Sequence, residues 1–116
     1  MKKINILKDS KEFDRIIKKY KSYKYKDYII FLERNTNDVY KFGLSVGKKI
    51  GNAVRRNKVK RQLKAIISQK DYQNNFNCII IVGKGINEKS FTEIKENLLI
   101  AFNNLNIIKE KHDEEK

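Results

Sequence analysis

The stretch GLSVGKKIGNAVRRNKVKRQLK, from Gly43 to Lys64, combines a helical apolar pattern with eight Lys or Arg residues and no carboxylate. Asn52 is suited to cap a helix, because its side chain can accept a hydrogen bond from a free amide of the first turn. Apolar residues then recur at i, i+4, i+7 and i+8, the stripe of a helix that packs on a sheet: Val59, Leu63, Ile66 and Ile67. The outward side of this helix is expected to carry Asn57, Lys60, Arg61 and Lys64.

Two apolar runs before this helix have the periodicity of strands. In DYIIFLE, alternation with period two separates two faces, with Tyr28, Ile30 and Leu32 on one and Ile29 and Phe31 on the other. VYKFGLSV alternates in the same way, and its polar face carries Lys41 and Ser45. The turn residues ERNTND between the runs predict that the two strands form a hairpin. Phe31 is therefore expected on an open face of the sheet.

Three further segments complete the expected fold. Asp9 or Ser10 can cap a short N-terminal helix, whose apolar residues at helical spacing are Phe13, Ile16, Ile17 and Tyr20. CIIIVG is a continuous apolar run and predicts a central strand that is buried on both faces. Ser90 and Glu93 form a capping box before a helix with the apolar face Phe91, Ile94, Leu98, Phe102 and Leu105. The order αβββαβα predicts an α+β fold, in which helices cover a small mixed sheet.

The charge balance indicates a polyanionic partner. The 116 residues include 27 Lys+Arg and 14 Asp+Glu, which gives a net charge of +13. Self-repulsion on this scale lowers stability unless a polyanion relieves it. Ten of the cations lie between Asp38 and Asp71, where there is no acid, so a specific surface is indicated. The length fits a single domain over residues 1–108, followed by a charged tail over 109–116.

Other classes of protein are not indicated. The single cysteine, Cys78, cannot form an internal disulfide, and the N-terminal apolar run is too short for a signal peptide. No apolar stretch approaches the roughly 18 residues that span a bilayer, so we expect a cytoplasmic protein without membrane contact. His112 is the only histidine, and no carboxylate pair or metal-ligand spacing stands out. The sequence therefore shows no constellation of residues of the kind that a protein nuclease needs.

Three interpretations of the basic stretch compete. A solvated helix face is the first, but typical surfaces mix both signs, and like charges four residues apart destabilise a helix by roughly a few tenths of a kcal/mol. A phosphate loop is the second, but it needs four residues between its glycines and a hydroxyl after the lysine. Gly43 and Gly47 are separated by three residues, and Lys49 follows Lys48. The third is a site for a nucleic-acid backbone, in which cations neutralise phosphates, and charge alone does not distinguish RNA from DNA.

The ordered residues of the stretch closely resemble the signature of the bacterial ribonuclease P protein subunit, in which Arg-Asn precedes Lys-Arg on a basic helix. The matching positions include Lys48, Lys49, Gly51, Asn52, Ala53, Val54, Arg56, Asn57, Lys60 and Arg61. The flanking elements also stand in the order of this family, over roughly Leu7 to Leu105. The resemblance implies the family's fold, which is ribosomal protein S5 domain 2-like and places the basic helix in a left-handed βαβ crossover.

For function, the resemblance implies a protein that joins a catalytic RNA subunit, ribonuclease P RNA. Together they would remove the 5′ leader of precursor tRNA by Mg²⁺-dependent endonucleolytic cleavage. The RNA would be the catalyst, Mg²⁺ would be held mainly by the RNA and the substrate, and no protein partner would be required. A structural RNA-binding protein, such as a ribosomal protein, is the alternative that charge and fold class leave open.

The resemblance also implies two binding surfaces. The first faces the catalytic RNA and comprises Lys48, Lys49, Asn52, Arg55, Arg56, Asn57, Lys58, Lys60, Arg61 and Lys64. The second is a cleft between the N-terminal helix and the sheet, which holds the leader and comprises Phe13, Ile17, Phe31, Lys41 and Ser45. Unpaired bases stack on exposed aromatic side chains for roughly 1–3 kcal/mol each, a role that suits Phe13 and Phe31. Ile17 stands where many members carry a second aromatic residue, and Lys58 and Lys64 stand where arginine is common.

Overall fold

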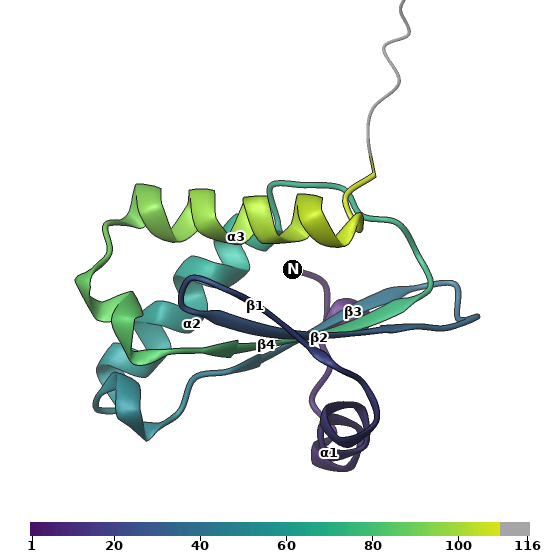
Figure 1. Ribbon diagram of the computed structural model, residues 1–116, viewed down its shortest axis with the longest axis horizontal. Helices are drawn as coiled ribbons and strands as arrows, with labels where there is room; N and C mark the ends of the chain where they lie inside the picture. The colour runs from purple at the N-terminus through teal and green to yellow at the C-terminus, as the bar shows by residue number, and fades with distance from the viewer. Residues whose placement is uncertain (110–116) are drawn as a thin grey trace, which may run out of the picture.

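Four strands form one sheet that is covered by helices on both faces (Figure 1). The computed structural model describes residues 1–109, so residues 110–116 of the predicted tail lie outside the described residues. The elements are η1 Lys3–Asn5, α1 Ser10–Lys19, β1 Ser22–Tyr25, β2 Tyr28–Arg34, β3 Tyr40–Ser45, η2 Lys48–Ile50, α2 Ala53–Ile67, β4 Phe76–Val82, η3 Lys84–Glu88 and α3 Phe91–Leu105. Without the short 3-10 turns η1 to η3, this is the predicted αβββαβα order. None of the helices in residues 1–109 has the length and hydropathy that a membrane-spanning helix requires.

The strands lie in the order β1-β2-β4-β3. β4 pairs antiparallel with β2 and parallel with β3, so the continuous apolar run is the buried central strand, as predicted. The predicted hairpin of β2 and β3 is wrong, because β4 lies between them. The connection from Asn35 to Val39 has to span two strand spacings, about 10 Å, which its length easily allows.

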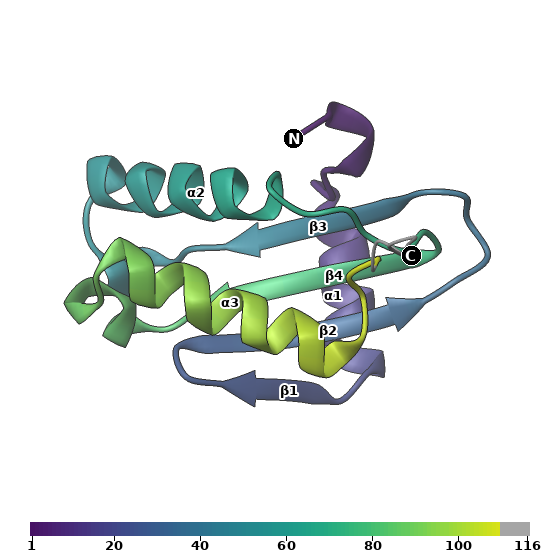
Figure 2. The same cartoon turned by 90° about the horizontal axis from the view of Figure 1, so that it is seen from above.

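α2 connects the parallel neighbours β3 and β4 (Figure 2). In this view both strands point to the left, α2 lies in front of the sheet, and β4 lies below β3. When this view is turned so that both strands point upward, with α2 still in front of the sheet, β4 lies to the left of β3. The crossover is left-handed, against the usual preference for right-handed connections, and this confirms the expected arrangement.

The larger core lies between the sheet and the helices α2 and α3. Asn52 caps α2, because its Oδ1 accepts the amide N–H of Arg55 at 3.0 Å. The capping box of Ser90 and Glu93 opens α3 as predicted. Phe91 is the first residue of α3 and is 43% exposed, so its predicted place on the buried face is wrong. The residues that the two helices bury are Val59, Leu63, Ile66 and Ile67 of α2 and Ile94, Leu98, Ala101 and Phe102 of α3.

α1 covers the opposite face of the sheet and closes a smaller core. The ring of Phe13 lies so close to Gly43 that a Cβ atom at this position would overlap it. Phe31 is only 9% exposed. The expectation that Phe31 lies on an open face is wrong, because α1 covers the middle of that face. The buried residues of this smaller core are Leu7, Ile16, Phe31 and Ile79.

Candidate nucleic-acid interface

The loop between β3 and α2 places cations at the N-terminus of a helix. Lys48 and Lys49 are exposed in η2. Gly51 follows with a φ of 148°, a backbone conformation that residues with a side chain rarely adopt. The first turn of α2 holds no acid, although the free amides at a helix N-terminus favour negative charge. This end of α2 is therefore suited to receive an anion such as a phosphate.

The predicted RNA-binding residues form one surface along η2 and α2. Seven of them are exposed: Lys48, Lys49, Asn52, Asn57, Lys58, Arg61 and Lys64. Three are half-buried: Arg55, Arg56 and Lys60. Within residues 1–109, the cations of this surface form no ion pair with a carboxylate. Their charges are therefore available to an external anion.

Arg55 has an internal role that the sequence did not reveal. Its Nε donates to Oδ1 of Asn87 in η3 at 2.7 Å. Nδ2 of Asn87 in turn donates to the backbone oxygen of Ile50 in η2 at 2.8 Å. These two hydrogen bonds connect the start of α2 to η3 and η2. Arg55 therefore contributes to the shape of the surface as well as to its charge.

A groove with a volume of about 610 Å³ opens near η2 and η3. Ile29 of β2 and Ile81 of β4, partners in the register, form part of its lining, together with Ser45, the next partner on β3. Ile29, Ile81 and Lys84 were not among the predicted site residues. The groove therefore combines apolar side chains with positive charge. Its lysines are Lys48, Lys49 and Lys84.

Phe13 lines a second hollow, at the edge of the sheet formed by β3. This hollow of about 250 Å³ is also lined by Leu44 of β3 and by Lys60 and Lys64 of α2. The ring of Phe13 is half-buried, so part of it remains accessible from this side. One predicted leader residue therefore lies beside two predicted RNA-binding residues.

The other predicted leader residues do not gather in one place. Ser45 lines the groove, and Ile17 is half-buried against the core under α1. Lys41 is the register partner of Asn77, and the side chain of Asn77 donates a hydrogen bond to Glu33. These three residues lie on the side of α1 that faces away from the groove. Because α1 crosses the row of residues between them, the structure does not bring Lys41 and Ser45 together.

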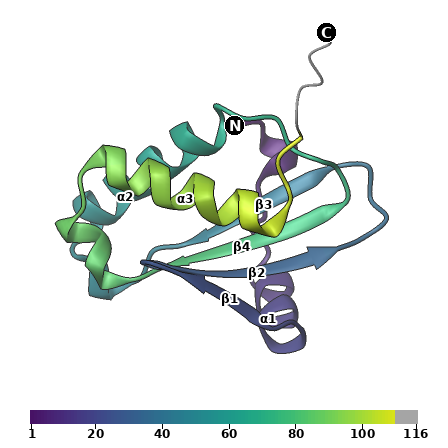
Figure 3. The same ribbon diagram turned by 45° about the horizontal axis from the view of Figure 1, so that its top comes forward.

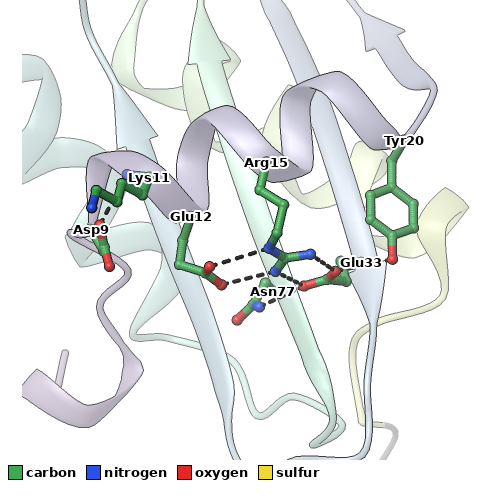
Figure 4. Close-up of polar contacts among 7 residues, drawn as sticks. All are labelled: Asp9, Lys11, Glu12, Arg15, Tyr20, Glu33 and Asn77. Atoms are coloured by element: carbon green, nitrogen blue, oxygen red, sulfur yellow. Dashed lines mark hydrogen bonds and ion pairs between the residues drawn. The ribbon is translucent and has the colours of Figure 1, made fainter.

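Arg15 and Glu33 hold α1 on the sheet (Figure 4). Two N–H groups of Arg15 donate to the Glu33 carboxylate at 2.6 and 2.8 Å, and Arg15 also donates to Glu12. The hydroxyl of Tyr20 and Nδ2 of Asn77 donate to Glu33 at 3.0 and 2.9 Å. Hydrogen bonding from Arg15, supported by Asn77 and Tyr20, lowers the pKa of Glu33 to about 2, against the effect of burial. The side chain of Glu33 is 8% exposed, so this carboxylate depends on its donors.

Replacement of Arg15 by methionine should lower the free energy of unfolding by about 2 kcal/mol, because it leaves Glu33 buried without its counter-charge. The loss of stability is smaller than for a fully buried pair, since the side chain of Arg15 is 41% exposed. The lowered pKa means that the ionised Glu33 stabilises the fold above its ordinary pKa of 4.5, and that this contribution is lost as the pH falls towards about 2.

Urea denaturation at several pH values checks this prediction. The difference between wild type and Arg15→Met should be largest at neutral pH and should shrink between about pH 4.5 and pH 2. Glu12→Gln is the matched control, because it removes the exposed partner of Arg15 and should change stability by less than about 0.5 kcal/mol. A difference that is independent of pH would contradict the role of Glu33.

Comparison with known proteins gives one family. The family profile described as Ribonuclease P matches residues 1–106. The Ribonuclease P protein component of Streptococcus pyogenes is 37% identical over 99 residues, which cover 84% of this chain and 83% of the relative. That of Bacillus pumilus is 36% identical over 105 residues, 88% of each chain.

Solved structures of the same family share the fold. The RNase P protein from Staphylococcus aureus superposes with a TM-score of 0.80 at 25% identity, over 90% of this chain and 98% of that one. The RNase P protein from Thermotoga maritima superposes with a TM-score of 0.73 at 27% identity, over 82% of this chain and 92% of that one. The similarity therefore extends over nearly the whole described chain.

Proposed function

Because the chain belongs to the ribonuclease P protein family, we propose that it joins ribonuclease P RNA and assists removal of the 5′ leader from precursor tRNA. In this proposal the RNA is the catalyst of the hydrolysis, and the protein binds RNA and positions the substrate. The observation that carries the proposal is the basic surface of α2 beside a groove that fits a single strand.

The surface along η2 and α2 is assigned to the catalytic RNA. Its cations neutralise phosphates, and the N-terminal amides of α2 add donors for a further phosphate oxygen. Asn57 is exposed between two cations and can form directional hydrogen bonds to the backbone or to a base. Repulsion among these like charges is relieved when RNA binds, which favours assembly of the complex.

The groove is assigned to the leader. Ile29 and Ile81 offer an apolar surface to unpaired bases, and Lys84 offers charge to the phosphates. Lys48 and Lys49 line the groove and also belong to the surface assigned to the catalytic RNA, so in this proposal they lie between the two RNA strands. Phe31 is not assigned a stacking role, because α1 covers it. Phe13 remains a candidate for base contact through the hollow that it shares with Lys60 and Lys64.

Mg²⁺ is assigned to the RNA and the substrate. Within residues 1–109, no three His, Cys, Asp or Glu side chains gather in a way that could hold a metal ion. The carboxylates of Glu12 and Glu33 both bond Arg15. Phosphate oxygens are the hard ligands that Mg²⁺ prefers, and the bound ion would activate the attacking water. The protein's own part is to lower the electrostatic cost of bringing two RNA backbones together.

Arg61→Ala should weaken binding to ribonuclease P RNA and reduce the slope of log affinity against log salt by about one unit. Arg61 is exposed on α2 and forms no ion pair with a carboxylate in the described part of the chain, so its loss should remove one phosphate contact without an effect on folding. Titrations over a range of KCl concentrations measure the slope. Lys95→Ala, on α3, is the control with the same loss of charge, and an unchanged slope in Arg61→Ala would remove Arg61 from the RNA surface.

The proposed role in reading the leader is tested by binding of the assembled RNA–protein complex to precursor and to mature tRNA. A subunit that binds the leader should make the complex prefer the precursor. A structural RNA-binding protein would stabilise the RNA and would leave the two affinities equal.

A further inference from the structure

One row of side chains crosses the α1 face of the sheet from the groove to the opposite edge. The register pairs Ser45 of β3 with Ile81 of β4, Ile81 with Ile29 of β2, and Ile29 with Lys24 of β1. Register partners share a face of the sheet, so the four side chains form a continuous line. The first three line the groove, and Lys24 is the next residue along the same line.

The edge at β1 is strongly basic. β1 and the residues that flank it, 20–26, include Lys21, Lys24 and Lys26 and no carboxylate. Tyr23 and Tyr25 pack against the core under α3, whereas Ser22 and Lys24 are exposed on the other face. Within residues 1–109, the Lys24 amine forms no ion pair with a carboxylate. Figure 3 shows this edge strand above α1, with α2 farther back over β3.

We infer that the leader crosses the sheet along this row and that Lys24 binds a leader phosphate beyond the groove. The inference rests on the proposed function, because it extends the path of the same RNA strand. The RNA strand passes Ser45, Ile81 and Ile29 and leaves over Lys24, a path of three strand spacings or about 14 Å. Ile81 and Ile29 therefore lie between Lys24 on one side and, beyond Ser45, the groove lysines Lys48 and Lys49 on the other. Bases of the strand can contact the isoleucines while its phosphates contact the lysines.

The competing explanation is protective. Lysines on an edge strand discourage pairing with another chain, and β1 is an edge strand. That protective role requires charge on the edge strand, but it does not explain why Lys24 lies in line with the groove residues Ile29 and Ile81. It also predicts no dependence of RNA binding on the length of the leader, and this difference separates the two explanations.

The test uses the complex of this protein with ribonuclease P RNA and precursor tRNAs whose leaders are lengthened one nucleotide at a time. For wild type, affinity should rise as the leader fills the groove and rise again when it reaches β1. Lys24→Gln should abolish the second rise, which weakens binding of long leaders about threefold, and should leave the shortest leaders unaffected. The salt slope for long leaders should fall by about 0.7. Lys24→Arg should retain the second rise, and Lys95→Gln on α3 is the control for loss of one charge.

The outcomes distinguish this inference from the proposed function. A wild-type complex that binds mature and precursor tRNA equally would overturn the proposed function, and the leader path with it. A wild-type preference for the precursor, combined with a Lys24→Gln effect that is absent or equal for all leader lengths, would overturn the path across β1 alone. Loss of the second rise in Lys24→Gln but not in Lys95→Gln supports the path.

Discussion

Phe31→Ala should lower the free energy of unfolding by about 3 kcal/mol, because it removes a large side chain from a packed cluster and leaves a cavity. Phe31 is 9% exposed and packs in the core that α1 closes with Leu7, Ile16 and Ile79. An aromatic ring in this position stabilises the contact of α1 with the sheet. Denaturation in urea, followed by circular dichroism, measures the change.

Phe91→Ala is the matched control for this prediction. Phe91 is 43% exposed at the start of α3, so its loss should cost less than about 1 kcal/mol. A Phe31→Ala variant that keeps the stability of wild type but binds precursor tRNA less tightly would contradict the structure. That result would restore the expectation, drawn from period-two alternation, that this ring is free to stack on a base.

Affinity for ribonuclease P RNA should fall on the order of a thousandfold between 50 and 200 mM salt if about six phosphates are neutralised. The available cations are those of η2 and α2, which have no carboxylate partner within the described residues. The cations of the first turn of α2 also lie at the unfavourable end of the helix dipole, and a phosphate placed there relieves this repulsion. Binding is therefore expected to depend on released counterions.

A titration series in KCl at constant Mg²⁺ measures this slope. The variant Arg61→Ala, with its slope reduced by about one unit, calibrates the contribution of a single contact. A slope close to zero for the wild-type protein would mean that phosphates do not dominate recognition. The assignment of η2 and α2 to the catalytic RNA would then be wrong.

The elements of the fold that depend on local sequence were predictable. The apolar stripe of α2, the Asn52 cap, the capping box at Ser90 and the continuous run of β4 each contain their own signal in neighbouring residues. The left-handed crossover was expected only from the family resemblance, since no local pattern encodes the hand of a connection.

The neighbours of a strand and the cover of a face could not be predicted in the same way. Alternation in DYIIFLE correctly separated two faces, but it does not say which strand lies beside β2 or which helix covers Phe31. Both depend on contacts between distant segments, such as the ring of Phe13 against Gly43. The predictions of a hairpin and of an open face were therefore wrong for the same reason, because a local pattern carries no information about contacts between distant segments.

The candidate site divides in the same manner. The cations of α2 were predictable because they follow one another in the sequence, whereas the groove combines Ile29, Ser45, Ile81 and Lys84 from three separate segments. Glu33 gave a weak signal, because a carboxylate on the same strand face as Ile29 and Phe31 requires a buried partner. Nothing in the sequence identified Arg15 as that partner.

The most direct test of the central claim is cleavage of a precursor tRNA by a bacterial ribonuclease P RNA at low Mg²⁺ concentration, with and without this protein. The substrate should have a leader several nucleotides long, and the position of the cut should be mapped. The account predicts protein-dependent cleavage at the mature 5′ end. Tight binding to the RNA without any stimulation of cleavage would contradict it and would identify the basic surface as that of a structural RNA-binding protein.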